Sequence, residues 1–265
     1  MARTYRFFLR NSSPPAKDFD LLAQTEPEIV FQISTVLRGK TSDEVVLLTP
    51  DNDEAGVECR FKIVEANKHH VKLEFVDSKE NKNELPFTLR VLLCLPNKPD
   101  KLDFMLQKAV EVGVQEIVLL ESDYSQMKHH LKPERIQKII MEAAEQCERA
   151  KISSFEMGGK LHNFLESNQK KETILVAMER MGLAPLADAQ KEMSTLDSVA
   201  AIFKKNIQQF NELNLLIGPE GGFSEAEKEY IKTLGLQCFS LGPRILRMET
   251  AMLLSSGLAS LLDLQ

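Results

Sequence analysis

A nearly continuous apolar segment, FTLRVLLCL at 87–95, most constrains the fold, because a strand of this kind is covered on both faces of a sheet. An amphipathic helix is predicted over 100–113 with Gly113 as its stop, and EIVLL at 116–120 returns to strand. This order predicts a β-α-β unit and hence a parallel sheet. The alternation continues with a predicted helix over 133–150, strands at 173–178, 213–217 and 237–241, and a mostly helical segment over 186–210.

The first part of the chain has a different pattern of apolar and turn residues. β-branched or alternating segments separated by turn residues predict strands at 44–49, 57–63 and 70–76. One short helix is predicted after Thr25, because Thr25 and Glu28 have capping-box spacing and Gly39 can close the end. We therefore expect a small β-rich domain over 1–76, a polar linker at 77–86 and an α/β domain over 87–265.

Charge and hydropathy narrow the function classes. The net charge of −6 argues mildly against promiscuous nucleic-acid binding, although basic groups gather locally at Arg3, Arg6 and Arg10 and at Arg38 and Lys40. No segment approaches the roughly 20 apolar residues of a membrane helix. The start of the chain lacks the apolar stretch and cleavage site of a secretory signal, so a cytoplasmic protein is expected.

Neither a metal site nor a disulfide framework is expected. The cysteines lie far apart, form no C-x-x-C pair and are expected to be buried thiols: Cys59, Cys94, Cys147 and Cys238. The pairs His69–His70 and His129–His130 are adjacent in sequence, so their side chains do not share a helix face, and we interpret them as solvated loop residues.

Two glycine-bearing loops near the C-terminus are the best candidates for chemistry. In LLIGPEGGFSEAEKE, at 215–229, a strand is followed by three glycines and a helix predicted to start at Ser224, which has capping-box spacing to Glu227. The start of a helix suits a ligand, because its first N–H groups lack internal partners. Neither familiar nucleotide-binding glycine motif fits this loop, and the glycines could serve only a tight turn.

The second loop, LGPRILRMETA at 241–251, repeats the arrangement after the last predicted strand. Arg244 and Arg247 flank the apolar pair Ile245–Leu246, and a helix is predicted to begin near Glu249. Loops that follow neighbouring parallel strands face one crevice at the carboxyl edge of the sheet. The sequence therefore predicts a pocket with apolar walls, backbone groups that read a ring edge, and arginines for an anion.

Together with LDFMLQKAVEVGV and EAAEQCERAKI upstream, these two loops resemble the ribosomal RNA small subunit methyltransferase E family, whose members methylate N3 of a uridine in 16S ribosomal RNA. The resemblance covers nearly the whole chain. It implies a knotted SPOUT-class α/β domain, with a mostly parallel sheet and helices on both faces, and a PUA-like RNA-binding domain before it. It also implies S-adenosylmethionine as cofactor, the small ribosomal subunit as partner, and a homodimer. Met248 and Glu148 depart from the family pattern, which usually has threonine and glycine there.

The resemblance and the chemistry of methyl transfer together lead to hypotheses about individual residues. Arg247 is expected beside the uracil oxygens, Arg244 on a phosphate or the cofactor carboxylate, and Glu249 as a base or as the partner of an arginine. RNA phosphates would be bound by Arg3, Arg6, Arg10, Arg38 and Lys40. The cofactor would be held by Met178, Ile217, Gly218, Glu220, Gly221, Leu241, Gly242, Ile245 and Leu246.

Alternatives stay open at this point. The enzyme could methylate another RNA position, or the chain could be a non-catalytic RNA-binding assembly factor, which would have no use for the two glycine loops. The last helix, ETAMLLSSGLASLLDL, is apolar nearly all round and is expected to be buried, either in a dimer or within its own domain.

Overall fold

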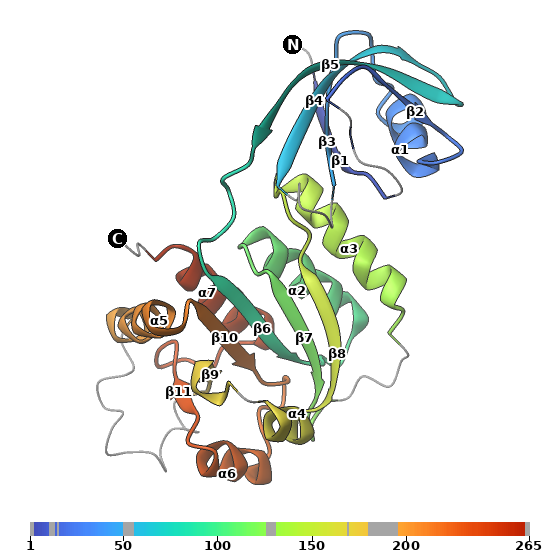
Figure 1. Ribbon diagram of the computed structural model, residues 1–265. Coiled ribbons are helices and arrows are strands. Elements are labelled where there is room, and N and C mark those ends of the chain that lie inside the picture. The colour runs from blue at the N-terminus through green and yellow to red at the C-terminus, as the bar shows by residue number, and fades with distance from the viewer. Residues whose placement is uncertain are drawn as a thin grey trace. The chain divides into compact units, whose positions relative to one another are not determined.

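The protein was analysed as a computed structural model that describes residues 3–10, 14, 16–49, 56–125, 131–168, 170–179 and 196–262 (Figure 1). By Cα packing the chain divides into two units: residues 1–84 with 144–152, and residues 85–143 with 153–265. The division falls inside the segment predicted as a linker, although a strand extends through its first residues to Glu80. The grouping of 144–152 with the first unit has no signal in the sequence.

The first unit is built on a five-stranded sheet in the order β1-β3-β4-β5-β2. β1 and β3 are parallel and the other neighbours are antiparallel. Phe7, Leu47, Phe61 and Leu73 lie in its core, together with Ile33. The elements are β1 (Thr4–Phe8), β2 (Phe19–Leu22), α1 (Pro27–Phe31), the π-helix η1 (Gln32–Val36), β3 (Glu44–Leu48), β4 (Val57–Ala66) and β5 (His70–Glu80).

Both predicted ends of the first helix were wrong. The N-cap is Glu26 and makes no side-chain cap, because Pro27 takes a first-turn helical position, where its missing N–H costs nothing. Thr25 Oγ1 donates instead to the carbonyl of Leu22, at 3.2 Å. At the other end Arg38, not Gly39, has the left-handed backbone (φ 52°). Gly39 is needed for close packing, since a Cβ there would lie 2.9 Å from Ile63 Cδ1.

The second unit contains a six-stranded sheet in the order β11-β9-β10-β6-β7-β8, and every neighbouring pair is parallel. The α/β class and the parallel sheet predicted from the apolar runs are confirmed. Its strands are β6 (Thr88–Cys94), β7 (Glu116–Glu121), β8 (Ser154–Lys160), β9 (Ile174–Ala177), β10 (Glu212–Ile217) and β11 (Gln237–Phe239). Its helices are α2 (Pro99–Glu111), α3 (Pro133–Gln146), α4 (Leu161–Ser167), η2 (Lys171–Thr173), α5 (Leu196–Phe210), α6 (Glu225–Thr233) and α7 (Met248–Ser260).

The C-terminal part of the chain returns across the middle of this sheet. β10 lies between β9 and β6, β11 is added on the far side of β9, and α7 then packs on β10 and β6 and against α2 (Figure 1). This path brings the ends of β9, β10 and β11 to one edge. The trefoil knot that the resemblance implies stays a prediction.

Sequence patterns missed β8 and α4. The β8 strand, SFEMGGK, is an edge strand with no fully buried side chain and two glycines, so it lacks the apolar run by which its neighbours were found. Three of the four cysteines are buried and Cys147 is partly exposed. No helix in the described ranges has both the length and the hydropathy to cross a membrane.

Candidate functional site

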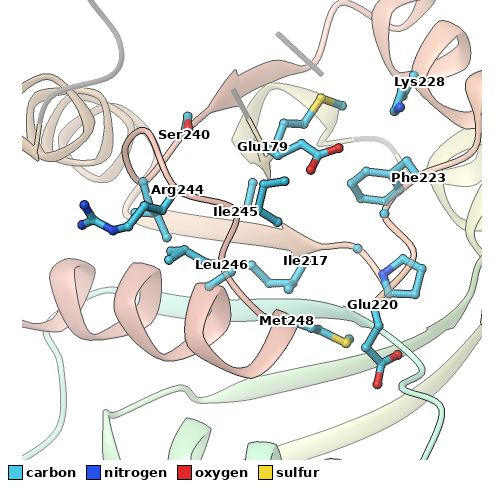
Figure 2. Close-up of a pocket in the computed structure, with 17 residues that line it drawn as sticks. Glu179, Ile217, Glu220, Phe223, Lys228, Ser240, Arg244, Ile245, Leu246 and Met248 are labelled. Carbon is cyan, nitrogen blue, oxygen red and sulfur yellow. The ribbon is translucent and has the colours of Figure 1, made fainter. Parts of the chain in front are cut away.

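The two glycine loops meet at one cavity of about 120 Å³ at the carboxyl edge of the second sheet (Figure 2). The end of β9 closes a third side. Most of the wall is apolar, and Ile217, Ile245 and Leu246 lie around its centre. The residues that line it are Ala177, Met178, Glu179, Ile217, Gly218, Pro219, Glu220, Gly222, Phe223, Lys228, Ser240, Leu241, Arg244, Ile245, Leu246, Met248 and Ala251.

The first loop, which follows β10, is shaped by two glycines with different tasks. Gly222 has a left-handed backbone (φ 72°), and its N–H donates to the carbonyl of Pro219 at 2.9 Å, which closes a tight turn. Gly218 has ordinary backbone angles, but a Cβ there would lie 3.0 Å from the ring of Phe223. The ring can therefore pack directly on the backbone and form part of the cavity wall.

The helix after this loop, α6, has its N-cap at Ser224 as predicted, and its N-terminus is capped by its own side chains. Ser224 Oγ accepts from the N–H of Glu227 at 3.2 Å, and Glu227 Oε2 accepts from the N–H of Ser224 at 2.8 Å. Ser224 Oγ also donates to Asp123 Oδ2 at 2.5 Å. At α6 the capping box satisfies the N–H groups of Ser224 and Glu227, so fewer amides are free for a ligand there than the sequence suggested.

The second loop, which follows β11, is more open. Gly242 has φ 113°, a conformation that residues with a Cβ rarely adopt, and its carbonyl accepts from Ser240 Oγ at 3.2 Å. Ile245 is 72% exposed at the mouth of the cavity. α7 then starts after Arg247, whose side chain makes no capping bond. The first amides of α7 are thus not satisfied by an N-cap side chain.

The structure brings most of the predicted cofactor residues together. Met178, Ile217, Gly218, Glu220, Leu241, Ile245 and Leu246 line the cavity, and so does Arg244. Gly221 and Gly242 belong to the same loops without lining it, and Gly222 lines it instead. Sequence reasoning missed Phe223, Ser240 and Lys228; a hydrophobic residue directly after the glycines was the one available signal.

Of the predicted catalytic residues Arg244 lines the cavity, whereas Arg247 and Glu249 are sequence neighbours of lining residues. Arg247 is exposed and follows the lining residue Leu246, and Glu249 stands between the first residue of α7 and Thr250. The guanidinium of Arg244 points away from Ile217 and Ile245 (Figure 2). No ion pair joins Glu249 to either arginine within the described part of the chain; its charged neighbour is Lys101, with Nζ 4.0 Å from Oε2.

The Glu220 carboxylate is bound by groups outside the cavity. It accepts from the amide of Asn97 at 3.1 Å and from Lys101 Nζ at 2.9 Å. Burial acts to raise the pKa of Glu220, but these hydrogen bonds outweigh it and hold that pKa below its ordinary value. Glu220 is therefore placed as an anion whose carboxylate is already bound by these groups.

The predicted RNA contacts in the first unit differ in availability. Arg6 is not available to bind RNA, because its guanidinium donates to Glu58 at 2.7 Å and its side chain is only 10% exposed. Arg10 is exposed but paired with Glu28. Arg3, Arg38 and Lys40 are exposed, and no described acidic residue pairs with them.

The buried carboxylate of Asp43 holds the backbone of two of these residues in place. Its Oδ1 accepts from the N–H of Arg3 at 3.1 Å, and its Oδ2 accepts from the N–H of Lys40 at 2.9 Å. Tyr5 Oη donates to the same carboxylate at 3.2 Å. The amides of Lys40 and Arg3 hold the pKa of Asp43 below its ordinary value. Asp43 therefore fixes the segment around Lys40 beside the first strand.

No three His, Cys, Asp or Glu side chains form a metal-binding group in the described ranges. Of the two histidine pairs, His129 and His130 lie outside those ranges.

The strand order, the return of α7 and the paired glycine loops form an α/β domain with a ligand cavity at the carboxyl edge of its parallel sheet. Residues 83–260 match the RNA methyltransferase domain family. The chain belongs to this family and, within it, to the ribosomal RNA small subunit methyltransferases E. Two relatives of that name support the assignment. The one from Buchnera aphidicola subsp. Schizaphis graminum is 30% identical over 83% of this chain and 82% of its own length. The one from Bacillus subtilis is 28% identical over 93% and 92%.

A solved structure supports the fold. The ribosomal RNA small subunit methyltransferase E from Neisseria gonorrhoeae, bound to S-adenosyl methionine, superposes with a TM-score of 0.73. Identity is 23%, and the match covers 96% of this chain and 95% of that chain.

Proposed function

We propose that the protein transfers a methyl group from S-adenosylmethionine to N3 of a uridine in small-subunit ribosomal RNA. The observation that carries the proposal is the meeting of both glycine loops at one mostly apolar cavity, with Arg244 among its lining residues. Family membership and the cofactor in the Neisseria gonorrhoeae structure support the cofactor assignment. The N3 position rests on the resemblance of the two loops.

The cavity fits an adenosyl group by the nature of its walls. Ile217, Ile245 and Leu246 offer aliphatic surface for a purine ring, and glycine at 218 lets the ring of Phe223 form part of the same wall. Met178 and Leu241 close the cavity from β9 and β11. When bound, S-adenosylmethionine supplies a methyl group on a sulfonium; the loops contribute by holding it in one orientation relative to the acceptor, and such positioning supplies much of an enzyme's rate.

The acceptor nitrogen requires a group that stabilises negative charge. Uracil N3 carries a proton that must leave before or during attack, so a guanidinium near the uracil oxygens lowers the barrier. Arg247 is exposed directly after Leu246 and is our candidate for this role. Arg244 is assigned to a phosphate or the cofactor carboxylate, and Glu249 to the departing proton. Because N3 lies on the Watson–Crick edge, the base must be unpaired or flipped out.

The first unit is proposed to bind RNA through Arg3, Arg38 and Lys40, with Arg10 as a weaker contact and Arg6 as a structural residue. Asp43→Asn tests this surface, because asparagine has one acceptor oxygen and must leave the amide of Arg3 or of Lys40 unpaired. We expect RNA affinity to fall several-fold, although the substitution removes a negative charge. Asp77→Asn removes the same charge from the Arg60 pair and should leave affinity equal or slightly higher. Unchanged or tighter binding by Asp43→Asn would reject the assignment.

A cytoplasmic homodimer is part of the proposal. α7 leaves Leu254 50% exposed, and Leu261, just beyond its end, is 85% exposed, which suits a helix that packs against a second copy. Sedimentation equilibrium should give twice the mass of the 30.0 kDa chain. A monomer at micromolar concentration would remove the dimer from the proposal.

The decisive experiment is methylation of small subunits, and separately of their free RNA, from cells that lack this protein. The purified protein and labelled S-adenosylmethionine are added, and the modified nucleoside is identified by mass spectrometry. We expect 3-methyluridine at one site. Another methylated nucleoside would keep the enzyme class and overturn the position, whereas RNA binding without methylation would favour an assembly factor.

A further inference from the structure

Lys101 contacts carboxylates from both sides of the cavity. It lies in the first turn of α2, and its Nζ is 2.9 Å from Glu220 Oε1 and 4.0 Å from Glu249 Oε2. Glu220 belongs to the loop after β10, and Glu249 to the first turn of α7. One ammonium therefore connects three elements that lie far apart in the sequence.

This cluster is more enclosed than an ordinary surface ion pair. The side chains of Lys101, Glu220 and Glu249 are 30%, 23% and 19% exposed. Glu249 Oε2 is buried and has no hydrogen-bond partner among the described residues, so the nearby ammonium is its main compensation. Exposed ion pairs contribute little because water screens them; partly buried ones are screened less.

The two glutamates of this cluster are also close in sequence to residues that line the cavity. Glu220 is two residues from Gly218, and Glu249 directly follows Met248; both neighbours line the cavity. If the ammonium is lost, two carboxylates remain near each other without their shared counter-ion, and their repulsion pushes the two loops apart. A pocket whose walls are not held in place binds its ligand less tightly, because ordering them costs free energy on binding.

We propose that Lys101 is a positioning residue that ties the two cavity loops together through Glu220 and Glu249 and thereby sets the affinity for the cofactor. The inference rests on the proposed function, since it takes S-adenosylmethionine as the ligand of the cavity. Lys101 acts through the carboxylates and does not touch the cofactor. The competing role, a direct contact of Lys101 with RNA phosphate, predicts no change in cofactor affinity.

Calorimetric titration with S-adenosylmethionine, without RNA, tests the proposal. Lys101→Met should weaken cofactor binding about tenfold, and Lys101→Arg, which keeps the charge, should stay within about threefold of the wild type. Lys108→Met is the matched control, because it removes a lysine from the same helix, where the lysine pairs with Glu111 three residues on and lies over the ring of Phe104. It should bind the cofactor like the wild type.

A double-mutant cycle shows whether Lys101 acts through Glu220. If it does, Lys101→Met combined with Glu220→Gln binds no more weakly than Lys101→Met alone. Thermal unfolding of each variant without ligand identifies one that is merely unfolded, in which case Lys101→Arg and Glu220→Gln still complete the comparison.

The outcomes separate the inference from the proposed function. Wild-type affinity in Lys101→Met, or strictly additive losses in the double variant, would overturn the positioning role while the wild type still binds the cofactor. A wild-type protein that does not bind S-adenosylmethionine would instead overturn the proposed function.

Discussion

The loop after β10 and the loop after β11 contain the same kinds of residue, yet their helices begin differently. Ser224 and Glu227 close the start of α6 with a reciprocal capping box, and Asp123 adds a further bond. α7 begins at Met248, its N-cap residue Arg247 makes no side-chain cap, and exposed Ile245 lies just before it. A loop closed by its own hydrogen bonds is a rigid wall, whereas a loop with uncommitted donors and cations can respond to a substrate. We therefore assign a fixed wall of the cofactor cavity to the first loop, and to the second loop the acceptor chemistry together with the rest of the cavity wall.

The largest expected effect is the loss of Arg247. Arg247→Ala should lower single-turnover methylation about 100-fold or more, because one donor to a developing anion is typically worth that much. Cofactor affinity, measured by calorimetry, should change little. Lys232→Ala, which removes an exposed cation from the helix of the first loop, is the control and should keep wild-type turnover. If Arg247→Ala were as active as the wild type, the assignment of the acceptor chemistry to the second loop would be wrong.

Replacing the glycines that have a left-handed backbone by alanine measures how much each loop depends on that backbone conformation. No atom lies within 4 Å of a Cβ at Gly222 or Gly242, so the cost is backbone strain alone. Gly242→Ala should cost about 1–3 kcal/mol of stability, and Gly222→Ala, nearer the common left-handed region, about 1 kcal/mol. Both should also weaken cofactor binding. Gly235→Ala (φ 66°), just after the end of α6, should destabilise the protein without changing its affinity for the cofactor. Weaker cofactor binding by Gly235→Ala would contradict the view that the effect is local to the two cavity loops.

Serine at position 247 tests whether α7 is uncapped for function. A serine N-cap contributes about 1 kcal/mol, so Arg247→Ser should be more stable than Arg247→Ala by about that amount. Both variants should be inactive. Urea denaturation measures the difference, and equal stability would mean that the amides of α7 are already satisfied in the folded protein.

The smallest effect concerns acid stability in the first loop. The pKa of Glu220 in the folded protein lies below its ordinary value of 4.5, so its ion pair stabilises the fold fully above about pH 4.5. That contribution is lost as the pH falls below 4.5 towards the folded pKa. The stability difference between wild type and Glu220→Gln should therefore shrink over this interval. A difference independent of pH would show that the carboxylate does not act as an anion.

Much of the α/β unit could be predicted from sequence because its signals are local. The apolar runs of β6, β9 and β10 reflect burial on both faces, and the Ser224–Glu227 spacing predicted an N-cap that the structure confirms. The same spacing failed at Thr25 because Pro27 fixed the helix start elsewhere. Glu148 adopts a left-handed backbone (φ 61°), which would suit the glycine that the resemblance leads us to expect there.

The sequence by itself determined the parallel sheet, the two loops and the residue types at the cavity, since each depends on neighbours a few positions away. Only the tertiary structure decided which side chains are free. Arg6 is occupied by Glu58, and Lys101 reaches Glu220 across 119 residues of sequence. The physical reason is that a charged side chain is committed by the partner that packing places beside it, and no local pattern encodes that partner.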